Sequence, residues 1–319
     1  MGPGGPARCS IRELTMDRAA LNRSAAFASI SVAVFLVALK GWAAWSTGST
    51  AMLGSLADTA LDLIASVATL VGVWVAAQPV DRGHRFGHGK AEALAAMFQV
   101  VLIAISALTL ALRAVEQFMA GARTAAASEG IGVSLVAMAA TVALLGWQRH
   151  VLRRTGSLAI ATDHVHYQSD LLLNLAVIAA LALDQFAGIA GVDPLFGFLI
   201  ALWLGWGAWK ASHAAIDQLM DREWPEERRR AFIDAIPRPP ELRGVHDLRT
   251  RTSGDQEFAQ FHVWLDGNLT VKQAHKVMDE IETALKAAFP DVEIFIHPDP
   301  VGHVDKGLAA VNVLRPARD

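Results

Sequence analysis

The stretch AMLGSLADTALDLIASVATLVGVWVAA, residues 51–77, decides the fold class, because it is long enough to cross a bilayer as a helix. Its only charged residues are Asp58 and Asp62. Residues four apart lie on the same face of a helix, so the two carboxylates project in one direction. A charge near the bilayer centre costs at least about 2.5 kcal/mol. Two adjacent anions in such a helix therefore predict a bound cation.

The rest of the chain predicts an α-helical membrane protein. The 319 residues are 53% hydrophobic and 18% charged, and the apolar residues cluster in the first two thirds. A span needs about 20 mostly apolar residues. Six stretches qualify as transmembrane helices: 25–47, 51–77, 94–119, 130–148, 157–183 and 195–216. We therefore expect an N-terminal segment, 1–24, followed by a six-helix transmembrane domain, 25–216.

The basic residues predict the orientation. Arg and Lys precede the first span and occupy the loops after the second and fourth spans, whereas the opposite loops contain one arginine between them. Short loops rich in Lys and Arg stay in the cytoplasm, so both termini are expected there. The opening MGPGGPARCS lacks the pattern of a cleaved secretory signal, so the first span is expected to remain.

Composition excludes several classes of function. A net charge of −3, with no basic patch interleaved with aromatic residues, gives no sign of nucleic-acid binding. The single cysteine, Cys9, can support neither a disulfide framework nor a thiolate metal site.

Residues 217–300 read as a soluble domain. A short amphipathic helix, EERRRAFIDAI (226–236), is followed by two alternating runs, GVHDLRTRTS (244–253) and EFAQFHVWLDG (257–267), with a hairpin signal between them. A helix with Thr270 as N-cap and the strand VEIFIHP (292–298) complete an α-β-β-α-β order. This order predicts a small open sheet with two helices on one face. Residues 301–319 are expected to be a flexible tail.

The fifth span supplies the complement to the first acidic pair. TDHVHYQSD, residues 162–170, contains His166 and Asp170, again four apart. Packed against Asp58 and Asp62, these residues would provide three carboxylates and one imidazole. Four such ligands suit a tetrahedral divalent ion, Zn²⁺ first, with Fe²⁺, Mn²⁺, Co²⁺ and Cd²⁺ left open. No position remains for an activated water, which favours holding and passing an ion over catalysis.

Two alternatives stay open at this site. A single intramembrane aspartate is often a structural group paired with a serine or a backbone carbonyl. Asp163 and His164 are left out of the ligand set, because Asp163 could equally cap the cytoplasmic end of the span.

Two further groups contain metal-ligand residue types. Between the second and third spans, Asp81, His84 and His88 are accompanied by glycines that let a short loop fold around an ion, although exposed loop histidines are usually only solvated. The soluble domain offers a larger set, in which three histidines lie on separate predicted strands. This set is His246, His262, His275, His297 and Asp299.

These motifs together resemble the cation diffusion facilitator family, and within it the bacterial ferrous-iron and zinc efflux proteins. The resemblance runs from about Ala25 to Pro300 and rests on DTALD (58–62), DRGHRFGHGKAE (81–92), HYQSD (166–170), VHDLRTR (245–251) and IHPDP (296–300). It implies a homodimer in the bacterial inner membrane, with a metallochaperone-like cytoplasmic domain.

The resemblance also implies three metal sites and one charge pair. The transport site matches Asp58, Asp62, His166 and Asp170, the loop site matches Asp81, His84 and His88, and the cytoplasmic site matches His246, His262, His275, His297 and Asp299. An interhelical charge pair matches Lys90 and Asp221.

Two departures from the family pattern affect the loop and cytoplasmic sites. Arg82 and Arg85 place positive charge beside the loop ligands, and Pro298 is expected to stiffen the turn between His297 and Asp299.

The implied function is efflux of a divalent cation, Zn²⁺ and also Fe²⁺, Cd²⁺ or Mn²⁺, by proton antiport. Zn²⁺ is both cargo and the expected regulator of the cytoplasmic site, protons are the counter-ion, and membrane lipid and a second copy of the chain are the partners. An uptake carrier or a channel could use the same ligands, although a tight four-ligand site favours a carrier. An intramembrane metallohydrolase is disfavoured, because H-E-x-x-H is absent. An aspartate rather than a histidine at position 58 leaves the metal preference open.

Overall fold

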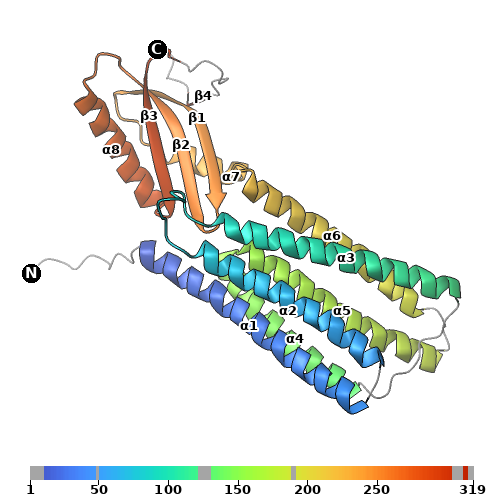
Figure 1. The fold of residues 1–319 in the computed structure, drawn as a ribbon. Coiled ribbons are helices and arrows are strands. Elements are labelled where there is room, and N and C mark those ends of the chain that lie inside the picture. Colours follow the sequence, from blue (N-terminus) through green and yellow to red (C-terminus); the bar gives the residue numbers. More distant parts are fainter. Residues whose placement is uncertain (1–10, 48–49, 121–130, 188–191, 304–311, 315–319) are drawn as a thin grey trace, which may run out of the picture. The chain divides into compact units, whose positions relative to one another are not determined.

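The computed structural model describes residues 11–47, 50–120, 131–187, 192–303 and 312–314 (Figure 1). Thr15–Ile216 form one compact unit, and a second unit contains Asp217–Asp319. The first unit is helical, and the second is built around a four-stranded sheet.

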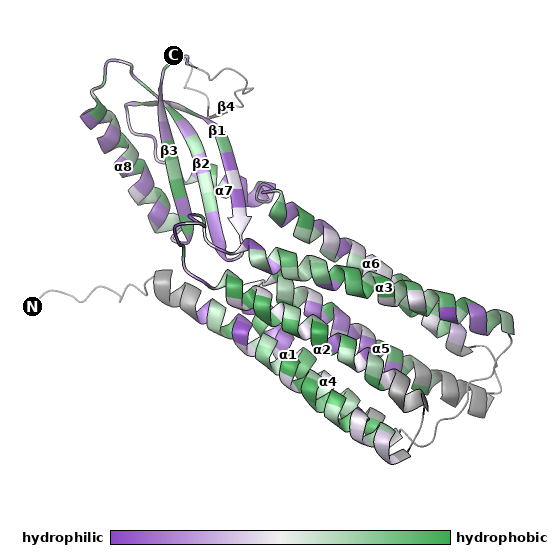
Figure 2. Cartoon of the chain, viewed as in Figure 1, coloured by the Kyte–Doolittle hydropathy of each residue, from purple (hydrophilic) through white to green (hydrophobic). Residues whose placement is uncertain are grey.

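The long helices follow the predicted spans. Five of them are long and apolar enough to cross a membrane, judged on the described residues, and Figure 2 shows many hydrophobic residues along them, interrupted by hydrophilic ones. Helix α5 contains the polar run TDHVHYQSD in its first half. The prediction of six long helices followed by a small α/β domain is confirmed. The helices are α1 (Ile11–Thr47), α2 (Thr50–Ala76), α3 (Lys90–Ala120), α4 (Ile131–Thr155), α5 (Leu158–Ala187) and α6 (Val192–Leu219).

Small residues let the helices of the first unit approach closely. A Cβ added at Gly72 of α2 would lie 2.3 Å from the Cβ of Ala95 on α3, closer than real atoms come. Close approach through small residues is the usual way in which membrane helices associate. Gly72 therefore fixes how closely α2 packs against α3.

The second unit has two helices packed on a sheet of order β3-β2-β1-β4. The Thr270 side chain accepts from the Gln273 backbone N–H, and the Gln273 side chain caps in return, so the predicted helix start is confirmed. Asn312–Leu314 form a strand that we did not predict, while 304–311 and 315–319 of the expected flexible tail lie outside the described residues. The elements are α7 (Glu226–Asp234), β1 (Leu242–Ser253), β2 (Gln256–Leu265), α8 (Val271–Ala288), β3 (Val292–Pro300) and β4 (Asn312–Leu314).

One face of this sheet forms the core. Phe232 of α7 and Ile281 of α8 share a buried cluster with Phe261 and Val263 of β2. Successive side chains of a strand point to opposite faces, so His262, between Phe261 and Val263, lies on the face away from the core.

The predicted hairpin between β1 and β2 is confirmed, with Gly254 of its two-residue turn at φ 64°.

Candidate metal sites

The proposed transport site joins α2 to α5. The ligand atoms of Asp62, His166 and Asp170 all lie within 4.8 Å of one another. His166 Nε2 is 2.9 Å from Asp62 Oδ1, and the histidine is 8% exposed. Two carboxylates and one imidazole on two helices form a nitrogen and oxygen ligand set that suits a divalent cation.

Asp58, the fourth predicted ligand, lies outside this group of three. It is exposed and sits one turn before Asp62 on α2, and its charge still acts on Asp170. Beside it, Lys40 Nζ of α1 donates to Thr59 Oγ1 at 2.6 Å. The structure thus brings three of the four predicted ligands together and places a lysine next to the acidic pair. Asp58 as a ligand stays a prediction.

Asp163 lies at the centre of a buried polar cluster that the sequence did not reveal. It is 0% exposed and accepts hydrogen bonds from Ser29 of α1, Gln99 of α3 and Gln148 of α4. Because α5 begins at Leu158 and Asp163 bonds to other helices, the alternative that it caps the span is wrong. One sequence signal for this cluster was available: Ser29, Gln99 and Gln148 are polar residues within separate apolar spans.

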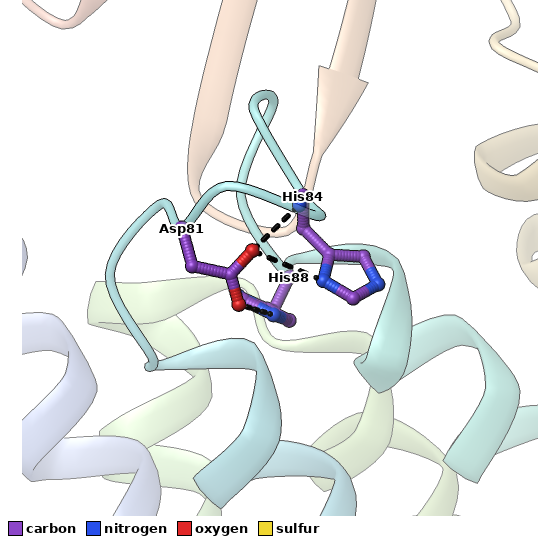
Figure 3. A group of neighbouring side chains, drawn as sticks. All are labelled: Asp81, His84 and His88. Atoms are coloured by element: carbon purple, nitrogen blue, oxygen red, sulfur yellow. Dashed lines mark hydrogen bonds and ion pairs between the residues drawn. The ribbon is translucent and has the colours of Figure 1, made fainter.

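The predicted loop ligands converge, as Figure 3 shows. Asp81 Oδ1 is 3.4 Å from His84 Nδ1, and Asp81 Oδ2 is 3.4 Å from His88 Nε2. The same carboxylate accepts from the backbone N–H groups of His84 and Gly83, and the His84 hydrogen bond is the main reason that the pKa of Asp81 is lowered. His88 is more buried than His84, with its side chain 10% rather than 63% exposed.

The sheet brings three predicted cytoplasmic ligands into one row. His246 on β1 pairs with His262 on β2, which pairs in turn with His297 on β3. Their shared acceptor is Asp299, whose Oδ2 is 2.8 Å from His262 Nδ1 and 3.2 Å from His246 Nε2. His297 Nε2 lies 3.3 Å from Asp299 Oδ1, but its side chain is 58% exposed. Strand register therefore gathers residues that are up to 53 positions apart in the sequence, 246 to 299.

The surroundings of His246 favour its neutral form, which can bind a metal ion. The ring of Trp264 stacks on His246 at 4.4 Å between centroids. Burial lowers the pKa of His246, although the nearby Asp299 acts in the opposite direction. A histidine kept neutral is the form that binds metal. The sequence missed Asp247, whose Oδ2 lies 3.8 Å from His262 Nε2.

His275 lies on α8, which packs against the core face of the sheet, so it is apart from the histidine row of its own chain; its Nε2 is 3.6 Å from Asp279. His275 as a ligand stays a prediction. One expectation about this site is corrected. Pro298 lies within β3 rather than in a turn, paired with Val263. Proline is tolerated there because β3 is an edge strand.

The predicted charge pair stays a prediction, because its members belong to separate units. Lys90 is the first residue of α3. Asp221 follows α6 with φ 56°, and its Oδ2 lies 3.7 Å from Arg251 Nη1.

Comparison with known proteins gives a consistent result. The model of the cation efflux transmembrane domain matches residues 26–220, and that of the cation efflux protein cytoplasmic domain matches residues 224–301. The cation-efflux pump FieF of Pectobacterium atrosepticum is 41% identical over 280 residues, covering 88% of this chain and 93% of the relative. FieF of Cronobacter sakazakii is 39% identical over 290 residues, covering 91% and 96%. A solved structure described as the zinc transporter CzrB, in its zinc form, is 39% identical, with 27% of this chain and 100% of that chain covered and a TM-score of 0.24.

Proposed function

This chain belongs to the cation diffusion facilitator family of cation efflux transporters, and we propose that the ion it carries out of the cytoplasm is Zn²⁺, exchanged for protons. The observation that supports this most is the group of Asp62, His166 and Asp170 on two apolar helices. Nitrogen and oxygen ligands at close range suit Zn²⁺, and thiolates are absent from the set. Asp58, one turn away on α2, is proposed to complete the coordination.

Proton coupling follows from the chemistry of these ligands. Carboxylate and imidazole bind a metal only when they are deprotonated, so protons and the ion compete for the same groups. Histidine ordinarily titrates near pH 6.5, within reach of the pH on either side of a bacterial membrane. His166 is therefore the proposed main proton carrier. Protons arriving from outside displace the ion, and their release to the cytoplasm restores the site.

Flux into vesicles tests both parts. Asp62→Asn removes one ligand charge at nearly constant size, and we expect it to abolish zinc flux. Thr141→Val is the matched control, because Thr141 is also buried in the bundle, at 5% exposed, but bonds only to the Ala137 carbonyl of its own helix. Undiminished flux in Asp62→Asn would exclude this transport site. Flux that does not change when the pH gradient is collapsed would exclude antiport.

The second unit is proposed to sense cytoplasmic zinc and to join two copies of the chain. The row of His246, His262 and His297 around Asp299 supports a metal site far from any span in the sequence. Combining His246→Ala with His297→Ala should remove the dependence of transport rate on cytoplasmic zinc. Lys286→Ala is the control, because Lys286 is exposed on α8 and pairs with Glu282. An unchanged dependence in the double variant would refute the sensing role.

The loop group of Asp81, His84 and His88 is proposed as a third, weaker site. Arg82 and Arg85 are both exposed beside it, and their charge opposes cation binding.

Asp221 is proposed to pair with Lys90. The inner membrane is the proposed location, and export over uptake is tested by growth, since loss of an exporter should make cells sensitive to added zinc.

A further inference from the structure

The buried carboxylate of Asp163 lies one turn from His166 and takes no part in the proposed ligand set. Its hydrogen-bond partners are all neutral: Ser29 Oγ at 2.6 Å, Gln148 Nε2 at 2.8 Å and Gln99 Nε2 at 2.9 Å. Each partner comes from a different helix, α1, α4 and α3 respectively. Asp163 therefore ties α5 to three neighbouring helices at one point.

The same cluster reaches α2 through Gln99. Its Nε2 also donates to Thr69 Oγ1 at 2.6 Å, so one amide nitrogen bridges Thr69 of α2 and Asp163 of α5. A second link between these two helices lies nearby, where Ser66 Oγ is 2.9 Å from Tyr167 Oη. All these side chains are at most 1% exposed. Neither link can exchange its partner for water without opening the bundle.

These links and the metal ligands lie at successive levels of the same two helices. On α2, Asp62, Ser66 and Thr69 are four and three residues apart, which places them on one face. On α5, Tyr167 and Asp163 are also four apart, next to His166. Two hydrogen-bonded contacts thus join α2 and α5 within two turns of the ligand group.

We propose that Asp163 is a positioning residue, which holds α2 and α5 at a separation suited to a small divalent ion and so sets the ion size that the site accepts. The inference rests on the proposed transport function. Zn²⁺ bonds to nitrogen and oxygen are short, about 2.0–2.2 Å. A larger ion such as Cd²⁺ needs longer bonds, and the helices must move apart to provide them. The cluster resists that movement.

The test is the ratio of kcat/KM for Zn²⁺ to that for Cd²⁺, measured with the full-length protein in vesicles. Asp163→Asn replaces one accepting oxygen with an amide NH₂ group, which cannot accept, and we expect the ratio to fall about tenfold, within the range found for groups that support metal ligands. Thr69→Val removes the α2 end of the bridge, and a several-fold fall is expected. Thr141→Val deletes an equally buried hydroxyl outside the cluster and should keep the wild-type ratio. Misfolding lowers both fluxes together, so it leaves the ratio unchanged.

An unchanged ratio in both Asp163→Asn and Thr69→Val would overturn the inference. If Asp163→Asn does not fold, Thr69→Val and Ser66→Ala decide, because each removes only one of the two links. The proposed function is judged separately from the same preparations. Zinc flux in the wild type that is lost in Asp62→Asn supports it, whatever the ratio does. A wild type that moves neither ion would overturn both the function and the inference.

Discussion

Replacing Gly72 by alanine tests how closely α2 and α3 pack. The added Cβ would lie 2.3 Å from Ala95 Cβ and 3.2 Å from the Ala91 carbonyl oxygen. Nonbonded carbons are most stable at about 3.5–4.0 Å, so the helices must separate by roughly 1 Å. Overpacking of this kind costs about 1–3 kcal/mol, and alanine returns about 1 kcal/mol of helix propensity. We expect Gly72→Ala to destabilise the protein by about 0–2 kcal/mol.

Gly146→Ala is the control in the same bundle. Nothing lies within 4 Å of the position that its Cβ would occupy, so only the propensity gain of about 1 kcal/mol remains. The two variants should therefore differ by about 1–3 kcal/mol, with Gly72→Ala the less stable in thermal unfolding of the detergent-solubilised protein. Zinc flux should fall only in Gly72→Ala, because α2 carries Asp62. A Gly72→Ala unfolding midpoint equal to or above that of Gly146→Ala would refute the reasoning.

Three further outcomes follow from the site geometry. His246→Ala should weaken zinc binding to the cytoplasmic site by about tenfold or more, and Lys286→Ala, at an exposed position on α8, should leave it unchanged; calorimetric titration of both variants decides whether the histidine row is the site. The pKa of Asp81 is held below its ordinary 3.8, so the turn that this carboxylate stabilises should persist above pH 3.8 and loosen as the pH falls through the lowered pKa. NMR of the Asp81 carboxyl carbon measures this pKa, and a value at or above 3.8 would contradict the reasoning. Lys40→Met should tighten zinc binding at the transport site several-fold, because the Lys40 ammonium group, hydrogen-bonded to Thr59, repels the bound ion. Weaker binding would instead mean that Lys40 supports the structure of the site.

Local sequence signals predicted much of the fold. Long apolar runs gave the membrane helices, because a bilayer accepts few other structures. Thr270 predicted a helix start correctly, since an N-cap is read from adjacent residues. The spacing of His166 and Asp170 also predicted that they share one helix face, because residues four apart lie on the same face.

Interactions between distant elements were harder to predict. The partners of Asp163 come from three other helices, and helical spacing does not say which helices are neighbours. His275 was assigned to the cytoplasmic site by the family resemblance, and the sequence could not show that α8 covers the opposite face of the sheet. The strand predicted at 292–298 was expected to turn at Pro298, whereas it continues to Pro300; an edge strand that tolerates proline cannot be recognised without the strand order.

The prolines at the end of β3 also limit how two copies can associate. The backbone N–H of Val301 donates to Leu265 of β2, so N–H groups of odd-numbered residues point into the sheet here and those of even-numbered ones point outward. Pro298 and Pro300 occupy the outward positions and have no N–H to offer. Another strand therefore cannot extend the sheet along this stretch, which protects the open edge from aggregation. Self-association of this domain thus cannot pair strands along the last residues of β3.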